Sequence, residues 1–228
     1  MIARKKEFFS GVVLMIVFVV VLILFFLPLY GGMNGLNYLD NLYNSISKGS
    51  AYYIPKVKKE SESFKGDLVT VALKMGDEKT AEQTALLLRG AGAEALVSGS
   101  SVKLSGDLGG ILESALDDAD AMYHNEGEKV RNRYGYEERR ALYNWWQAFH
   151  EMDKDLKKQK KFKEAAMVSV VVKKAIESSY NYYQIEPQRI GDKFGMVIFS
   201  LVFYVVYTLW YGFAILFMFE GWGLQLGH

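Results

Sequence analysis

Two stretches of the sequence that contain no charged residue constrain the fold more than any other feature. Residues 8–39 and 194–219 have no Asp, Glu, Lys or Arg, and both are rich in Val, Ile, Leu and Phe. A helix needs roughly 20 consecutive apolar residues to cross the hydrocarbon core of a bilayer. The sequence therefore predicts two transmembrane helices, residues 8–30 and 194–219, that bracket a long polar region.

The charges at the N-terminus predict the orientation of these helices. Arg4, Lys5 and Lys6 precede the first helix, whereas no Lys or Arg follows the second. By the positive-inside rule, both short ends, residues 1–7 and 220–228, are expected in the cytoplasm. The polar region is then extracytoplasmic, and we expect a bacterial inner-membrane protein with a periplasmic domain. The first apolar stretch is longer than a signal-peptide core and no A-x-A-like site follows it, so we expect an uncleaved anchor.

The composition excludes several classes of function. The formal net charge is +1, with no Cys and only three His. A nearly neutral extracytoplasmic region is not expected to bind nucleic acid. Without Cys there is no covalent haem attachment and no iron–sulfur ligation, and neither apolar stretch contains a His for haem. No nucleophile motif or phosphate loop is present, so we expect neither catalytic activity nor a cofactor.

The segment 31–66 is predicted to be a linker that includes a short helix at the membrane interface. Leu36, Leu39, Leu42 and Tyr43 recur at helical spacing. Residues 51–66 are expected to form a loop, because Pro55 breaks a helix and the neighbouring residues are polar.

The segment 67–127 shows the most regular pattern and predicts a β-α-β-β-α unit. Apolar residues alternate over 69–75, a capped helical segment follows, and two short strands flank the turn sequence SGSS. A second helix places eight residues on one face: Leu108, Ile111, Leu112, Ala115, Leu116, Ala119, Met122 and Tyr123. The order of elements resembles the split unit of ferredoxin-like folds, with the last strand missing or supplied from elsewhere.

The segment 128–190 is predicted to be mainly helical, because about 50 consecutive residues lack Gly and Pro. Apolar residues spaced by three and four predict the seam of a coiled coil or a helical hairpin, and we expect this seam to bind a partner: Leu142, Trp145, Phe149, Met152 and Leu156. The seam ends in a run of lysines, where a bend or an antiparallel fold-back is expected. The predicted fold class is thus an α+β membrane protein.

Two groups of charged residues are interpreted as solvated surfaces. Glu113, Asp117, Asp120 and His124 lie on one helical face and could bind a divalent metal. We expect instead an acidic face without metal. The second group is a basic cluster that could contact lipid headgroups or an acidic partner, but interleaved acidic residues favour a solvated surface. It consists of Lys154, Lys157, Lys158, Lys160, Lys161 and Lys163.

Hydroxyl groups in the second apolar helix provide the main argument about function. Near its centre, estimated at Tyr207, five polar side chains lie on or beside one face: Ser200, Tyr204, Tyr207, Thr208 and Tyr211. An unpaired hydroxyl in hydrocarbon costs on the order of 2–7 kcal/mol. The first helix offers only Ser10 and Gly11 near its start, so we expect another chain, a second copy or a ligand such as a quinone to satisfy this face. The alternative is that the tyrosines face lipid or bind backbone carbonyls.

These observations predict a non-catalytic accessory or structural subunit of a multi-subunit membrane complex, or a homo-oligomeric membrane scaffold. Its partners would be membrane lipid together with other membrane-protein subunits or further copies of itself, bound through the second apolar helix and the helical seam. The alternative function is a membrane-anchored extracytoplasmic module that binds a ligand or an envelope component.

Overall fold

The computed structural model describes residues 2–224, and the chain divides into two units. The first unit contains the residues up to Ser47 and those from Pro187 onward, and the second contains Lys48–Glu186. Most of the described residues are helical and a small sheet is present, which confirms the predicted α+β class at this level. The first unit is formed by the helices α1 (Lys5–Phe26), α2 (Gly35–Ser50) and α10 (Ile190–Trp222). The last residues of α2 belong to the second unit.

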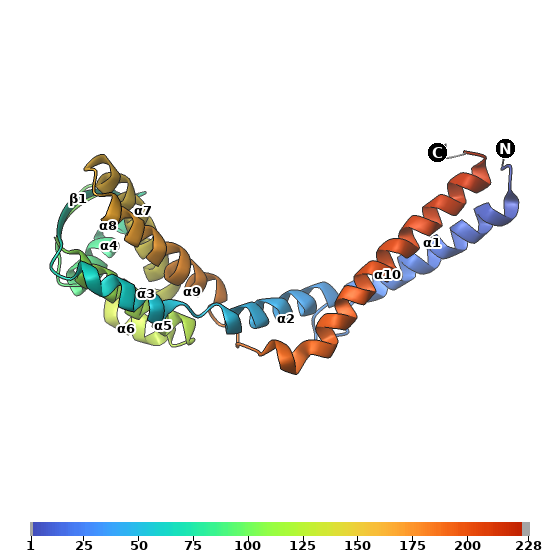
Figure 1. Cartoon of the computed structure of the whole chain (residues 1–228), viewed down its shortest axis with the longest axis horizontal. Coiled ribbons are helices and arrows are strands. Elements are labelled where there is room, and N and C mark those ends of the chain that lie inside the picture. The colour runs from blue at the N-terminus through green and yellow to red at the C-terminus, as the bar shows by residue number, and fades with distance from the viewer. Residues whose placement is uncertain (1, 225–228) are drawn as a thin grey trace. The chain divides into compact units, whose positions relative to one another are not determined.

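Helices α1 and α10 pack side by side as an antiparallel pair (Figure 1). At one end, the backbone N–H of Arg4 donates to the carbonyl of Gly221 at 2.9 Å. At the other end, the rings of Phe25 and Phe203 stack with their centroids 5.9 Å apart. Helix α1 therefore pairs with α10 only from about Phe203 onward, and the first turns of α10 extend beyond it.

Small residues allow the backbones of α1 and α10 to approach closely. A Cβ atom added at Gly11 would lie 2.7 Å from the backbone nitrogen of Met218 and 2.8 Å from the carbonyl oxygen of Ala214. Gly221 lies against the backbone of Phe8 in the same way. Close packing at Gly and Ala is typical of helix pairs in membranes, because there van der Waals contact replaces the hydrophobic effect.

The length and surface of these two helices suggest a membrane protein. Their most apolar windows have mean hydropathies of 3.2 and 1.9, and only 6% of the residues in each window are buried. A core helix of a soluble protein would bury such side chains, since exposing them to water is unfavourable. Both predicted apolar helices are present. Helix α1 ends at Phe26, shortly before Pro28, because a proline disfavours helical geometry at the residue that precedes it.

The second unit contains one sheet and nine further helical segments among the described residues. Its elements are α3 (Ile54–Ser61), η1 (Glu62–Phe64), β1 (Leu68–Lys74), α4 (Glu78–Gly90), β2 (Glu94–Ser98), β3 (Ser101–Asp107), α5 (Leu108–Tyr123), α6 (Gly127–Tyr134), α7 (Glu138–Lys158), α8 (Phe162–Val171), η2 (Val172–Ile176) and α9 (Glu177–Tyr182). The predicted loop over 51–66 is wrong, because α3 occupies its centre. Pro55 lies in the first turn of α3, where a missing N–H breaks no helical hydrogen bond.

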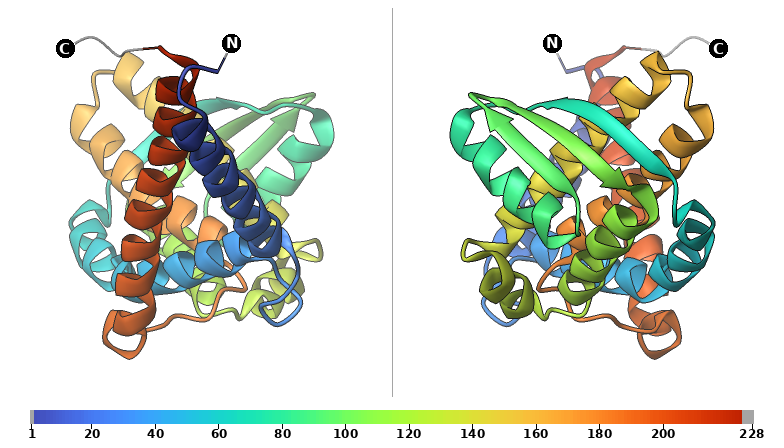
Figure 2. Two further views of the ribbon diagram at one scale, coloured as in Figure 1. Left: turned by 90° about the vertical axis from the view of Figure 1, so that its right-hand side faces the viewer. Right: turned by 90° about the vertical axis from the view of Figure 1, so that its left-hand side faces the viewer.

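The three strands have the order β1-β3-β2, and β3 is antiparallel to both neighbours (Figure 2). In the register, Val71 of β1 and Ala95 of β2 both lie opposite Leu104. All three side chains are buried, whereas Leu96 on the opposite face is exposed. Helices of the second unit cover one face of the sheet.

Side chains near the end of α7 cover the open edge of β1, where a fourth strand would pair in a complete ferredoxin-like sheet. The N–H of Ala72 donates to Asp155 Oδ2 at 3.2 Å. Gln159 Nε2 donates to the carbonyl of Thr70 at 2.9 Å, and Lys161 Nζ donates to the carbonyl of Leu68 at 3.2 Å. Because an unpaired strand edge invites aggregation, these contacts protect the sheet.

Helix α5 buries all eight residues of its predicted apolar face. Asp107 caps its N-terminus by accepting from the N–H groups of Gly109 and Gly110. The apolar face contacts the sheet through β3, and it also packs on α3, α6 and the segment from α7 to α9. The sheet is therefore only part of the environment of this face.

Helices α7 and α8 form an antiparallel hairpin, and the chain folds back at 159–161 in the lysine run, as the loss of the seam predicts. Lys160 takes a left-handed conformation there, with φ of 60°. The second arm contains the π-helical turn η2 between α8 and α9.

Two carboxylates inside the second unit are held by several donors each. Asp118 accepts from Arg133 Nη1 at 2.7 Å, from the Tyr134 hydroxyl at 2.7 Å and from Trp145 Nε1 at 2.9 Å. Buried carboxylates need such partners because burial removes their hydration. These contacts tie α5, α6 and α7 together.

The second carboxylate, Glu138, begins α7 and is only 4% exposed. Arg131 donates to both of its oxygens, at 2.8 and 2.9 Å, and the Tyr183 hydroxyl donates at 2.8 Å. Burial acts to raise the pKa of Glu138, but the hydrogen bonds from Tyr183 and Arg131 outweigh it and hold the pKa below its ordinary value.

The ends of the second unit are joined by a buried lysine. Lys48 Nζ donates to the carbonyls of Tyr182 and Ile185, at 3.0 and 2.6 Å, and to Asn125 Oδ1 at 3.0 Å. Three oxygen acceptors satisfy the ammonium group, which offsets the cost of its burial.

The close contact at Gly11 predicts that Gly11→Val separates α1 from α10. Overpacking of this kind costs about 1–3 kcal/mol. The chain has no Cys, so cysteines introduced at Phe18 and Tyr207, whose rings stack at 4.2 Å, report the distance between the helices through a short cross-linker. Gly11→Val should cross-link several-fold more slowly than the parent. The control is Gly212→Val, where an added Cβ meets nothing within 4 Å. Equal cross-linking of the two variants would contradict the helix pairing.

The Glu138 contacts predict a pH-dependent loss of stability. Because the pKa of Glu138 is lower in the folded state than in the unfolded chain, its contribution is complete above the unfolded value and is lost as the pH falls through the folded value. Glu138→Gln should reduce the free energy of unfolding by about 2 kcal/mol near neutral pH. The difference from the parent should shrink between about pH 5 and pH 2. Urea unfolding of the full chain in detergent measures the free energy of unfolding at each pH, and Glu82→Gln, at an exposed position, is the control. A difference that does not change with pH would refute the stabilising role of the Glu138 carboxylate.

Candidate functional site

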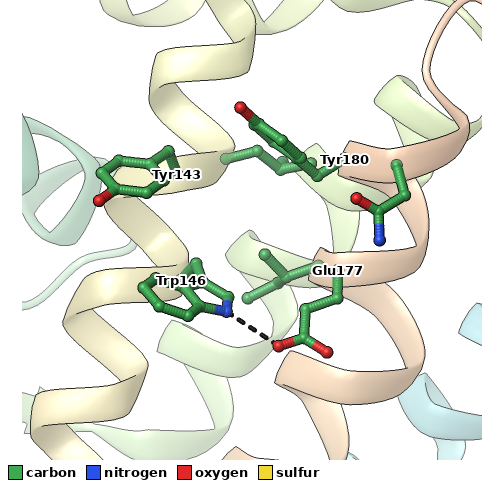
Figure 3. Close-up of a pocket in the computed structure, with 7 residues that line it drawn as sticks. Tyr143, Trp146, Glu177 and Tyr180 are labelled. Carbon is green, nitrogen blue, oxygen red and sulfur yellow. Dashed lines mark hydrogen bonds between the residues drawn. The ribbon is translucent and has the colours of Figure 1, made fainter.

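A cavity of about 300 Å³ opens between α7 and α9 in the second unit. Figure 3 shows aromatic side chains from both helices around it, with the Glu177 carboxylate opposite Trp146. Its size lies at the lower end of the range for small-molecule sites. We call it the aromatic pocket, and it is lined by Leu142, Tyr143, Trp146, Ile176, Glu177, Tyr180 and Asn181.

Helix α7 supplies the first wall of the aromatic pocket from a face beside its buried seam, and the seam residue Leu142 also lines the pocket. The Tyr143 and Trp146 rings are stacked with centroids 5.8 Å apart, and His150 lies 4.1 Å beyond Trp146. Trp145 and Trp146 are adjacent in sequence, so they point about 100° apart around the helix. Trp145 is therefore buried in the core, whereas Trp146 reaches the pocket.

Helix α9 supplies the second wall, and the turn η2 comes directly before it. Glu177 begins α9, and Tyr180 and Asn181 follow at positions i+3 and i+4, on the same face. A π-turn inserts one extra residue and thereby rotates the following positions around the helix axis; such turns occur frequently at functional sites. Trp146 Nε1 donates to Glu177 Oε1 at 2.9 Å and connects the two walls (Figure 3).

Two arginines lie against the tyrosines of the aromatic pocket. The guanidinium of Arg139 lies 5.8 Å from the centre of the Tyr180 ring, and that of Arg140 lies 5.3 Å from the Tyr143 ring. Arg139 also lies 5.5 Å from the Tyr183 ring. Burial raises the pKa of Tyr183, and its hydrogen bond to Glu138 raises it further, so its hydroxyl remains a donor. The Glu138 contacts thereby hold one side of the pocket in place.

The lining of the aromatic pocket suits recognition of a small ligand. Three aromatic rings provide apolar and π surface, whereas Glu177 and Asn181 provide a charge and an amide. Apolar rings combined with a few polar groups are typical of sites that bind small molecules.

The sequence-predicted hydroxyls of α10 do not form one shared surface. Ser200 is buried and pairs with the Tyr43 hydroxyl at 2.6 Å. Thr208 donates to its own helix, at the carbonyl of Tyr204, at 2.7 Å. The Tyr207 ring stacks on Phe18, and its hydroxyl is buried without a hydrogen-bond partner among the described residues. Within the chain, Ser200 and the Tyr207 hydroxyl are thus buried against α2 and α1.

Tyr204 and Tyr211 remain available, with exposed fractions of 69% and 45%. Helix α1 also satisfies polar and aromatic groups of α10, although it has few polar side chains of its own. Trp210 Nε1 donates to the carbonyl of Leu14 at 3.1 Å, and Phe18 packs against two of the tyrosines of α10. The prediction counted polar side chains of α1 and overlooked its backbone oxygens and ring faces.

The predicted helical seam is part of the chain's own core. All five residues are fully buried, so they offer no surface to another chain: Leu142, Trp145, Phe149, Met152 and Leu156. The predicted apolar spacing is correct, but the partner assigned to it is wrong, because the fold-back brings α8 and β1 onto α7.

The acidic face of α5 is neutralised by nearby lysines and not gathered into one site. Lys65 pairs with Glu113 at 2.9 Å. Lys58 pairs with Asp117 at 2.8 Å and with Asp120 at 3.4 Å. No group of three or more potential metal ligands occurs among the residues that the structure describes.

The basic cluster also forms mostly local pairs on a helix surface. Lys154 pairs with Glu151 at 2.6 Å, and Lys157 pairs with Asp153 at 2.7 Å. Lys161 covers the edge of β1. These contacts agree with the predicted solvated surface.

Sequence reasoning missed the aromatic pocket, although one signal was present. Tyr143, Trp146 and His150 follow each other at spacings of three and four, which places a row of rings on one face of α7 beside the seam. The contribution of α9 has no such signal, because it depends on η2.

Comparison of the chain with known protein families, with characterised proteins and with solved structures finds no match in any of the three. Its function is therefore argued from the geometry of these sites.

Proposed function

We propose that this protein is a non-catalytic, membrane-anchored subunit that joins other membrane-protein chains, or further copies of itself, through α10. The apolar surfaces of α1 and α10 would contact lipid. The observation that carries the proposal is the hydroxyl of Tyr211, which has no hydrogen-bond partner among the described residues and lies halfway along the paired helices.

The contacts between the two helices locate this hydroxyl. They extend from Phe8 with Gly221 to Phe25 with Phe203, so their midpoint on α10 lies near Gly212. Tyr211 is one residue away, or about 1.5 Å along the axis. Water begins about 15 Å from the bilayer centre, beyond the reach of a tyrosine side chain. An acceptor on a neighbouring chain would satisfy this hydroxyl.

The same contacts change the role of Tyr204. Eight residues separate it from Gly212, which is about 12 Å along the helix axis. From there its hydroxyl reaches the headgroup region, where tyrosines anchor membrane helices. The sequence-based estimate placed the centre of the helix near Tyr207, which made Tyr204 deeper than the pairing indicates. Tyr211, flanked by Thr208, is therefore the centre of the proposed contact surface.

We place the protein in a bacterial inner membrane, with both chain ends in the cytoplasm and residues 48–186 in the periplasm. Arg4, Lys5 and Lys6 support this orientation, because cations in a short terminal segment remain on the cytoplasmic side. The antiparallel pairing of α1 with α10 is compatible with it, since the pairing brings the start of α1 beside the end of α10.

This orientation predicts that a protease added outside spheroplasts cuts the second unit. A cysteine introduced at exposed Glu82 should likewise react with a membrane-impermeant maleimide, and one introduced at Lys5 should react only after lysis. Labelling in the reverse order would overturn the orientation.

The contact surface predicts that Tyr211→Phe weakens assembly while the helix stays inserted. An interhelical hydrogen bond in a membrane contributes about 0.6 kcal/mol on average and up to about 1.7 kcal/mol. Loss of one bond should weaken association roughly threefold to fifteenfold. Detergent titration with mass spectrometry of the co-purifying chains, or of the homo-oligomer, measures the change.

Tyr207→Phe is the matched control for this experiment. It removes the same atom from the same helix, but that hydroxyl is sealed between α1 and α10, where no partner reaches it. Tyr207→Phe should leave assembly unchanged. If Tyr211→Phe assembles as strongly as Tyr207→Phe, or if the parent is a monomer without partners, the subunit proposal fails.

A second candidate function is a membrane-anchored module that binds an extracytoplasmic ligand or envelope component. The aromatic pocket favours it, because a cavity of about 300 Å³ with three rings and one carboxylate is typical of small-molecule recognition. The pocket lies between α7 and α9, outside the β-α-β-β-α unit.

A further inference from the structure

We propose that the aromatic pocket binds an organic ammonium ion, a class that includes choline and related quaternary amines. This inference rests on the second candidate function, since it names the ligand of that pocket. It is independent of assembly through α10.

The walls of the pocket provide the π surface that such ions prefer. Tyr143 and Trp146 come from α7, and Tyr180 comes from α9, so rings lie on two sides of the cavity (Figure 3). A cation within about 6 Å of a ring centre is attracted by the negative face of the ring, most strongly for Trp. Aromatic cages of this composition recognise quaternary ammonium groups.

Glu177 supplies the negative charge that selects a cation over a neutral molecule. One of its oxygens accepts from Trp146 at 2.9 Å. The other oxygen has neither a hydrogen bond nor an ion pair within the described part of the chain, and none of the lining residues is a Lys or Arg. A carboxylate between aromatic walls is only partly hydrated, so a bound cation would compensate its charge.

The two arginines define what else the ligand carries. Arg139 and Arg140 lie at cation–π distance from Tyr180 and Tyr143, so a guanidinium already occupies a position near each of these two rings. Their own charge repels a second cation beyond the pocket. The ligand should therefore carry its ammonium group at one end and a neutral or anionic group at the other.

The test is titration of the full-length protein with choline chloride in a maltoside detergent, followed by isothermal calorimetry. The comparison ligand is 3,3-dimethylbutan-1-ol, which has the shape of choline without its charge. Choline should bind at a single saturable site, and the neutral molecule should bind at least about tenfold more weakly. Equal binding of the two molecules would overturn the proposal. So would the absence of saturable choline binding up to about 10 mM, because a Kd of that size corresponds to a binding free energy of only a few kcal/mol.

Two variants test the residues. Glu177→Gln should weaken choline binding about tenfold, whereas Glu82→Gln on α4 should leave it unchanged. Arg139→Gln should strengthen it several-fold, because a competing positive charge is removed. An anionic ligand would respond to Arg139→Gln in the opposite direction, so weaker choline binding in this variant overturns the assignment even if Glu177→Gln fails to fold.

The same protein separates failure of the ammonium proposal from failure of the binding function. If choline does not bind, a thermal-shift screen of neutral and anionic small molecules follows, with Trp146→Ala as the reference variant. A ligand whose stabilising effect is lost in that variant would keep the binding function and refute the ammonium ion. No ligand of any class would refute both.

Discussion

The unpaired edge of β1 is the constraint on which the second unit depends. The strand order leaves β1 at an edge of the sheet, where its outward backbone groups need partners, and the end of α7 provides them through Asp155 and Gln159. This contact requires α7 to lie along the sheet, so its seam fills the core. Side chains of α7 beside the seam face α9, which continues the second arm of the hairpin, and the aromatic pocket forms between them.

Hydrophobic periodicity predicted much of this arrangement, because burial depends directly on spacing. The face of α5 from Leu108 to Tyr123 and the seam of α7 are buried as their spacing requires. The fold-back in the lysine run was also predictable, since no apolar face continues through it. Periodicity does not identify the partner of a buried face, and the seam was for that reason assigned to another chain.

Features that depend on a single backbone irregularity or on backbone atoms were not predictable. The turn η2 rotates Glu177 and Tyr180 toward α7, but its sequence, Val172–Ile176, resembles ordinary helix. The bond from Trp210 to the Leu14 carbonyl uses an atom that every residue carries. Pro55 was interpreted as a helix breaker, although the same residue is favourable in a first turn.

The second unit is inserted into the first at a point where the two connecting segments of the chain lie close together. In the second unit, Lys48 donates to the carbonyl of Ile185, and in the first unit the N–H of Gln188 donates to the carbonyl of Ser45 at 3.0 Å. The chain thus leaves and re-enters each unit at neighbouring points. Units with adjacent ends are interchangeable modules, since one can be replaced without reshaping the other. Residues 48–186 are therefore an inserted domain, which interrupts a simpler unit built around the antiparallel pair α1 and α10.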